Sequence, residues 1–132
     1  MSQENVEVVQ RLYARWDAAD FGSIAAMLDP GVEASAPEGW PESGPWQGRD
    51  AVLAQMRTVR NNFGDQTIVI EQIETKSDCV VTRHRVLARG IRSGLDAEFE
   101  TSGAFRVHAG KIIEARFFWE HTEALKAVGL EE

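Results

Sequence analysis

The chain has 132 residues, of which 43% are hydrophobic and 27% are charged, and its formal net charge is −7 at pH 7. A chain of this length can bury one core, so we expect residues 1–132 to form a single domain. The acidic balance argues against nucleic acid and an anionic membrane surface as partners, because both need a basic patch. With one cysteine, Cys79, no internal disulfide can form. The sequence shows neither a signal segment nor an apolar run of membrane-spanning length, which favours a cytoplasmic protein.

Helical spacing predicts the first two elements. A helix is expected over Asn5–Trp16, because its apolar residues recur at helical spacing and form one stripe. Asp20 can accept the free backbone N–H groups of a second helix, Phe21–Leu28, as its N-cap. A proline and a glycine end that helix, and Gly31–Ala36 is predicted to be a short strand.

The segment Pro37–Gly48 is expected to be irregular. It holds three of the four prolines and two tryptophans, Trp40 and Trp46. Proline and glycine at this density exclude a helix interior and a central strand. The loop would either cover a ligand as a lid or pack its tryptophans onto the domain or a second subunit. A third helix is predicted over Asp50–Phe63.

The second half of the chain predicts four strands and a final short helix, Thr122–Val128. Apolar and polar residues alternate along the strands, which is typical of antiparallel strands with one buried face. The predicted strands are Gln66–Thr75, Asp78–Arg89, Ala97–His108 and Lys111–Glu120, with a tight turn at Ala109-Gly110 before the last.

The alternation assigns one face of each of the last three strands to the interior. His84 is the one ionisable residue on these inward faces. The inward residues are expected to be Val80, Thr82, His84, Val86 and Ala88 on the first strand, Ala97, Phe99, Thr101, Gly103, Phe105 and Val107 on the second, and Ile113, Ala115, Phe117 and Trp119 on the third.

Helices followed by a run of antiparallel strands indicate an α+β domain rather than a doubly wound sheet. The expected order is α-α-β-α-β-β-β-β-α. Because long strands twist and curl, we expect a curved mixed or antiparallel sheet wrapped around the helices as a half-open cone. The apolar strand faces would line its interior.

Three stretches of the chain carry a resemblance to a known family. They are VVQRLYARWDAADFGSIAAMLDPGVEASAP, WQGRDAVLAQM and SGAFRVHAGKIIEARFFWEHTEALKAVGL. The chain resembles a SnoaL-like protein of the nuclear transport factor two-like superfamily, whose cone-shaped fold (a cystatin-like roll) also serves ketosteroid isomerases, polyketide cyclases and limonene epoxide hydrolase. The resemblance implies this fold over nearly the whole chain. It implies no single activity, because the scaffold hosts enzymes, ligand binders and interaction modules.

The catalytic positions implied by the resemblance are not matched. Where ketosteroid isomerases carry a general-base Asp, an oxyanion-donating Tyr and a second oxyanion-donating Asp, this chain has Ala36, Leu12 and Gly103. Tyr13 is next to Leu12, which stands where those isomerases carry the oxyanion-donating Tyr.

The other two catalytic patterns of the superfamily are incomplete as well. The epoxide hydrolase positions for Arg and two Asp residues read His84, Val86 and Phe117. Polyketide cyclases of this type use a cavity-facing His and Asp, and these strands offer His84 without an inward Asp. Glu33, Glu38 and Glu120 are the carboxylates whose reach toward the cavity the sequence leaves open.

The candidate site is therefore built around His84. A buried neutral imidazole can act as a general base, and the alternative is a structural histidine held by a neighbouring side chain. Tyr13 and Trp16 either donate to a ligand or pack in the core. The candidate ligand-binding residues are Tyr13, Trp16, Trp40, Trp46, Thr82, Val86, Thr101, Phe105, Phe117 and Trp119.

We expect no metal and no cofactor, because the spacing of the three histidines matches no metal site and no phosphate-binding loop is present. His108 is expected to be exposed, and His121 to be a surface or capping residue. The outward strand faces mix charges with Val81, Leu87, Ile112 and Phe118, which favours a homodimer through this face.

Three functions follow as hypotheses. The first is a domain that binds a small apolar or ring-containing molecule in the cone. The second is an isomerase or polyketide-cyclase-like enzyme with His84 as general base. The third is a non-catalytic dimeric interaction module.

Overall fold

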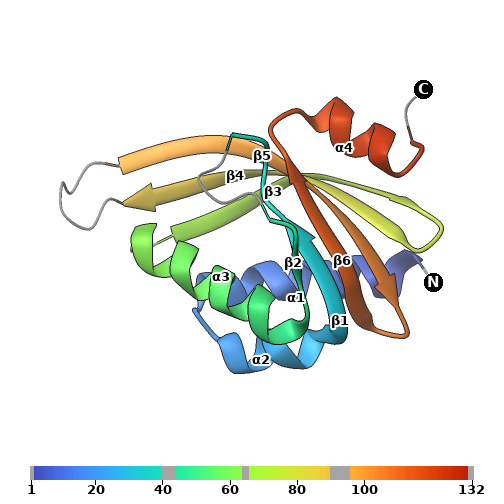
Figure 1. Cartoon of the computed structure of the whole chain (residues 1–132). Helices are drawn as coiled ribbons and strands as arrows, with labels where there is room; N and C mark the ends of the chain where they lie inside the picture. The colour runs from blue at the N-terminus through green and yellow to red at the C-terminus, as the bar shows by residue number, and fades with distance from the viewer. Residues whose placement is uncertain (1, 40–43, 64–65, 90–95, 131–132) are drawn as a thin grey trace.

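One curved six-stranded sheet forms the wall of the molecule, and α1 to α3 lie on its concave side (Figure 1). The computed structural model describes residues 2–39, 44–63, 66–89 and 96–130. Its elements are α1 (Ser2–Asp17), α2 (Phe21–Met27), β1 (Leu28–Ser35), β2 (Trp46–Gln47), α3 (Arg49–Phe63), β3 (Gln66–Lys76), β4 (Cys79–Arg89), β5 (Asp96–His108), β6 (Lys111–Phe118) and α4 (His121–Ala127).

The strands are arranged in the order β2-β1-β6-β5-β4-β3. The β1–β6 pair is parallel and the other pairs are antiparallel, so the sheet is mixed. This is the α+β cone that the sequence predicts, with one addition. The short strand β2 lies within the segment predicted to be irregular and pairs with β1 through Glu33 and Gln47.

The junction between α2 and β1 differs from the prediction. Asp20 caps α2 as expected, with its Oδ1 accepting a hydrogen bond from the Ser23 amide at 3.2 Å. The helix ends at Met27, and β1 starts directly at Leu28, so Pro30 belongs to the strand rather than to a helix terminator. It can do so because the β1–β6 register is interrupted between Leu28 and Glu33, where a missing N–H costs no ladder bond.

A second irregularity reverses the expected face of one isoleucine pair. Arg106 is in register with Glu114 and Val107 with Ile112, so β6 has an extra residue, Ile113, opposite β5. Such a bulge shifts the alternation by one position. The prediction was therefore wrong here: Ile112 is fully buried on the inner face, and Ile113 is only half-buried.

The main core lies between the helices and the concave side of the sheet, and it includes Val9, Ile24, Val32 and Phe105, which have at most 1% of their surface exposed. Cys79 is buried. Among the described residues, no helix has the length and apolar character needed to cross a membrane.

The convex side of the sheet carries a second, smaller core under α4 (Figure 1). Val81, Ala104 and Ala124 are buried there, and Phe118, Leu125, Val128 and Leu130 pack against them. The sequence analysis assigned Val81 and Phe118 to a face open for a partner. The chain's own last helix covers them instead.

His121 fastens α4 to this side of the sheet. Its Nδ1 lies 2.9 Å from the Ser102 hydroxyl on β5, and its Nε2 lies 3.1 Å from Oε2 of Glu74 on β3. Only 14% of its side chain is exposed, and the N-cap position belongs to Glu120, which makes no side-chain capping bond. His121 is thus neither a surface nor a capping residue, whereas His108 is exposed as predicted.

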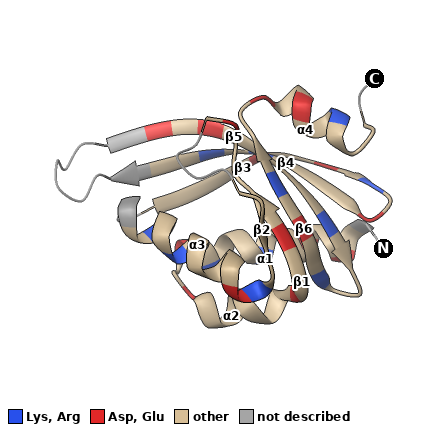
Figure 2. Ribbon diagram, in the orientation of Figure 1, with Lys and Arg blue, Asp and Glu red and all other residues tan. Residues whose placement is uncertain are grey.

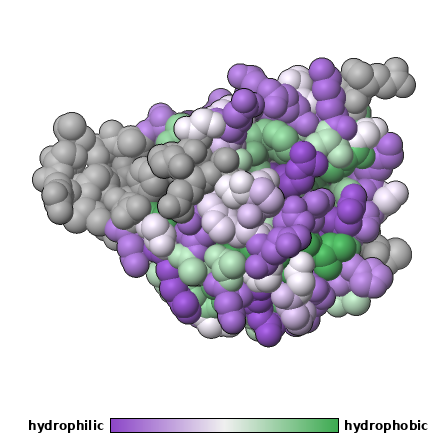
Figure 3. All heavy atoms as spheres, in the orientation of Figure 1, coloured by the Kyte–Doolittle hydropathy of each residue, from purple (hydrophilic) through white to green (hydrophobic). Residues whose placement is uncertain are grey.

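Charged pairs cover much of the rest of the convex face (Figure 2). Arg85 pairs with Glu98 at 3.2 Å and with Glu71 at 3.5 Å, and Arg83 lies 3.7 Å from Glu100. These are the cross-strand pairs that alternating charges on adjacent strands allow. Hydrophilic residues make up most of the visible described surface in Figure 3, with hydrophobic residues in small patches between them.

Candidate ligand cavity

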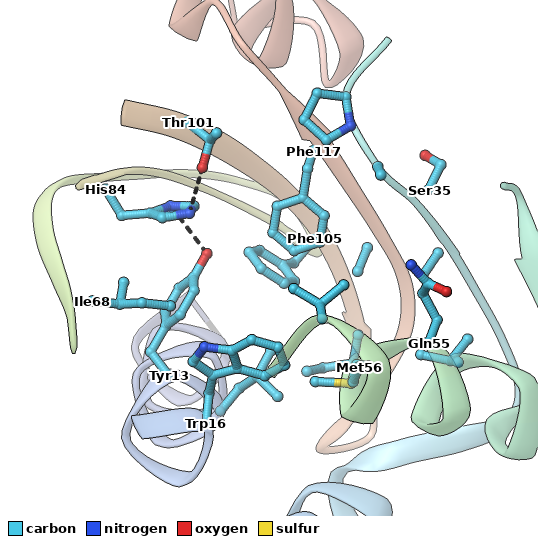
Figure 4. Close-up of a pocket in the computed structure, with 18 of the residues that line it drawn as sticks. Tyr13, Trp16, Ser35, Gln55, Met56, Ile68, His84, Thr101, Phe105 and Phe117 are labelled. Atoms are coloured by element: carbon cyan, nitrogen blue, oxygen red, sulfur yellow. Dashed lines mark hydrogen bonds between the residues drawn. The ribbon is translucent and has the colours of Figure 1, made fainter. Parts of the chain in front are cut away.

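A cavity of about 190 Å³ lies inside the cone, between α1, α3 and the concave side of the sheet (Figure 4). Most of its lining is aliphatic or aromatic, including Leu12, Trp16, Met56, Ile68, Phe105 and Phe117. Among the described residues that line it there is no Asp, Glu, Lys or Arg. The polar side chains are few, which is the usual make-up of a small-molecule site.

A chain of hydrogen bonds crosses one end of this cavity (Figure 4). The Thr101 hydroxyl lies 2.7 Å from Nε2 of His84, and the Tyr13 hydroxyl lies 3.2 Å from its Nδ1. The Thr82 hydroxyl lies 3.0 Å from the Tyr13 oxygen and 3.3 Å from Nδ1. Both nitrogens of the imidazole therefore have partners within the protein.

Burial keeps this network neutral. It lowers the pKa of His84 to about 4, so the imidazole is uncharged at neutral pH. Burial also raises the pKa of the Tyr13 phenol, and the hydrogen bond with Thr82 offsets only part of that rise. The network acts through hydrogen bonds between uncharged groups rather than through a charge.

Counting protons shows what this network offers a ligand. Three hydroxyls and a neutral imidazole carry four polar protons, and three hydrogen bonds connect Thr101 to His84, His84 to Tyr13 or Thr82, and Thr82 to Tyr13. One proton is left over. If Nε2 carries the imidazole proton, the Thr101 hydroxyl is the spare donor; if Nδ1 carries it, the spare donor is either the Tyr13 or the Thr82 hydroxyl. Tyr13 and Thr101 line the cavity, so they are the two that can offer the proton to a ligand.

The helix that carries Tyr13 is fixed to the sheet at its C-terminal end. Trp16 Nε1 donates to Oε1 of Gln66 at 2.9 Å, and the amide of Ile68 donates to Oδ1 of Asp17 at 3.0 Å. Arg60 of α3 donates to the Trp16 carbonyl oxygen at 3.2 Å. Together these contacts hold α1 against α3 and β3, the strand next to the one that carries His84.

Aromatic rings close the cavity on the β5 and β6 side. Phe105 and Phe117 meet edge to face with centroids 5.6 Å apart, and Phe105 meets Tyr13 in the same way at 5.9 Å. Both phenylalanine rings lie over Gly103: a Cβ at that residue would come within 2.7 Å of the Phe105 ring and 3.2 Å of the Phe117 ring. The glycine is thus required by the aromatic packing.

Most of the candidate residues come together around the cavity. His84, Tyr13, Trp16, Trp46, Val86, Thr101, Phe105 and Phe117 line it. Thr82 faces inward as expected but is fully buried, so it contacts Tyr13 rather than open space. Trp119 is 44% exposed and donates from Nε1 to the Glu38 carbonyl oxygen at 2.8 Å, outside the lining. Trp40 lies outside the described residues.

None of the three carboxylates in question lines the cavity. Glu33 accepts a hydrogen bond from Nε2 of Gln47 at 3.2 Å, and Glu38 and Glu120 are exposed. The described residues also contain no group of three His, Cys, Asp or Glu side chains able to hold a metal ion.

The sequence analysis missed the contribution of α3 and β3. Gln55, Met56 and Val59 line the cavity from α3, and Ile68 lines it from β3. The helical spacing of Val52, Gln55, Met56 and Val59 would have shown that α3 presents one mixed face to the interior.

A comparison with protein-family models matches residues 9–115 to the SnoaL-like domain. The chain belongs to the SnoaL-like domain family. A comparison with curated proteins found no match. The cone fold and the helix arrangement of this SnoaL-like domain are those of the nuclear transport factor two-like superfamily, as the sequence predicts.

Solved structures confirm the fold. A SnoaL-like protein from Jannaschia sp. CCS1 has a TM-score of 0.79 at 19% identity, over 98% of this chain and 94% of that one. TerC, co-crystallised with polyporic acid, has a TM-score of 0.78 at 19% identity, over 93% and 96%. RV0760c from Mycobacterium tuberculosis, in complex with estradiol-17beta-hemisuccinate, has a TM-score of 0.76 at 18% identity, over 89% and 94%.

Proposed function

We propose that this SnoaL-like domain binds a small, neutral, largely apolar ring compound inside the cone. The observation that carries the proposal is the apolar and aromatic lining of a cavity of about 190 Å³. An engineered apolar cavity of about 150 Å³ is enough for benzene, so a compound of one or two rings suits the space. Two structures of the same fold, TerC and RV0760c, were solved with ligands.

The spare proton of the hydrogen-bonded network gives the ligand one polar requirement. A carbonyl or hydroxyl oxygen next to Tyr13 and Thr101 would accept it. Because neither hydroxyl is exposed to bulk water, a hydrogen bond to a ligand acceptor there contributes more to binding than the same bond at the surface.

Three observations support binding over an isomerase or cyclase reaction with His84 as base. The pKa of His84 is lowered to about 4, which makes the imidazole a weak base. Both of its nitrogens are already bonded to protein hydroxyls. Among the described residues no carboxylate lines the cavity to orient the imidazole or to stabilise its charged form.

We also propose that two copies of the chain pair through the part of the convex sheet face that α4 leaves open. Val69 and Leu87 are 37% and 39% exposed there, on β3 and β4. Arg85 is the register partner of Val69 on this face. A second copy would cover the apolar pair.

Isothermal titration calorimetry with 2-naphthol and naphthalene tests ligand binding. We expect 2-naphthol to bind and to bind more tightly than naphthalene, because its oxygen accepts the spare proton. Ala115→Leu, which pushes a larger side chain into the cavity, should weaken 2-naphthol binding at least about tenfold through lost space.

Ala54→Leu is the matched control, because Ala54 is exposed on α3 and should leave binding unchanged. Circular dichroism and thermal melting establish that both variants fold. Absence of binding of either probe to the folded wild-type protein, or equal binding by Ala115→Leu, would overturn the proposal.

A further inference from the structure

Gln55 is the polar side chain of α3 that lines the cavity. It lies between Val52, Met56 and Val59 at helical spacing, and all three of these neighbours also line the cavity. In Figure 4 Gln55 and His84 lie on opposite sides of the cavity, with the Phe105 and Phe117 rings between them. The cavity therefore has polar groups at two separated places.

The other polar groups of the lining that face α1 have partners within the protein, apart from the one spare proton of the His84 network. The Trp16 indole and the Gln66 amide bond each other at 2.9 Å, and the hydroxyls of Tyr13 and Thr101 bond His84. The Gln55 amide has no hydrogen-bond partner among the residues that the structure describes. It presents two donors and one acceptor oxygen to the cavity.

Gln55 is half-buried, so a ligand that covers its amide pays for the lost hydration unless the ligand itself bonds to the amide. A ligand without a second polar group would bind more tightly if this position of α3, next to Met56, held leucine or methionine. An amide both donates and accepts, so it recognises a hydroxyl or a carbonyl. Neither the amide nor any other group of the described lining carries a charge, so nothing there offsets the negative charge of a ligand carboxylate.

We propose that Gln55 is a specificity-determining residue that selects ring compounds with neutral oxygen functions at opposite ends. One oxygen bonds to Tyr13 or Thr101, and the other bonds to the Gln55 amide. This inference rests on the proposed ligand binding in the same cavity and names the ligand class more closely.

The test compares 2-naphthol with naphthalene-2,6-diol, which has a second hydroxyl at the far end of the same ring system. By calorimetry the wild-type protein should bind the diol about three- to tenfold more tightly, the range expected for one added neutral hydrogen bond. Gln55→Leu keeps the side-chain volume and removes the amide, so it should abolish this preference while 2-naphthol still binds.

Thr58→Val is the matched control: Thr58 is exposed on the same helix, and its hydroxyl bonds the Ala54 carbonyl oxygen rather than the cavity. It should keep the preference for the diol. If the diol binds no more tightly than 2-naphthol, or if Gln55→Leu keeps the preference, the role of Gln55 is overturned while the proposed function stands. If neither probe binds the folded protein, the proposed function itself fails.

Discussion

His84 is surrounded by neutral hydroxyls and rings. Its ring centroid lies 4.9 Å from that of Tyr13 and 6.3 Å from that of Phe117, and its side chain is buried. A cationic imidazole at this place would lose its hydration and gain no anion in return. The residue is therefore suited to organising the donors Tyr13 and Thr101 and unsuited to carrying charge.

The buried imidazole predicts a specific pH dependence of stability. In the unfolded chain His84 takes up a proton below its ordinary pKa of 6.5, whereas in the folded protein burial lowers its pKa to about 4. Between these values the unfolded state binds more protons, so the free energy of unfolding falls as the pH falls. From about pH 7 to about pH 5 this one residue should remove about 2 kcal/mol.

Urea unfolding of the wild-type protein and of His84→Gln at both pH values isolates the contribution of His84, because the remaining titrating groups are shared. The variant should be less stable at neutral pH and lose less stability on acidification. Parallel losses in the two proteins would show that His84 is not buried as a neutral base.

At the scale of single elements, the terminal helix α4 depends on a few contacts. It buries one alanine, Ala124, and its N-terminal turn is held by His121 between Ser102 and Glu74. A seven-residue helix is not stable alone in water, so its docking decides whether it forms.

His121→Ala should loosen α4. We expect the free energy of unfolding to fall by about 1–2 kcal/mol, because two hydrogen bonds to partly buried groups are lost. Trypsin should also cleave faster after Lys126, which is exposed on this helix. His108→Ala, which removes an exposed histidine, is the control and should change neither measurement. Equal cleavage rates in the two variants would contradict the role of His121.

The strands show what alternation can and cannot predict. It correctly places His84, Val86 and Thr101 on the inner face, because apolar and polar residues there have opposite environments. It failed at Ile112 and Ile113, since two adjacent isoleucines carry no signal for the bulge that decides which is buried. The alternation also predicts which face of the sheet a side chain is on but not how deeply it is buried. Thr82 was therefore expected at the cavity although Tyr13 covers it.

At the scale of the whole molecule, the cone was predictable because the order of elements and the length of the strands leave few other arrangements. The sequence did not show in the same way which residues on the convex side of the sheet are covered and which are open to solvent. Phe118 reads as an exposed apolar residue in the sequence, but α4 and the Arg116 guanidinium, 5.2 Å from its ring centroid, cover it. Whether such a residue is exposed depends on the packing of a segment that is distant in the sequence, and no local pattern indicates that packing.

The proposed dimer should respond to Leu87 rather than to Phe118. Leu87→Asp places a charge on the open part of the convex face and should shift native mass spectra from dimer to monomer at micromolar concentration. Ala14→Asp, on the exposed side of α1, introduces the same charge elsewhere and should leave the dimer intact. A wild-type protein that is monomeric in the same experiment would contradict the pairing.

Gly103 constrains the evolutionary history open to this chain. The position corresponds, by the resemblance to ketosteroid isomerases, to one that carries an acidic oxyanion donor, and here the rings of Phe105 and Phe117 occupy the space above its Cα. An aspartate introduced alone would collide with both rings. The acid becomes acceptable only after the rings have become smaller, and smaller rings alone would leave a void. The effect of each substitution therefore depends on the others, and this epistasis separates the present cavity from an isomerase-type one by more than a single mutational step.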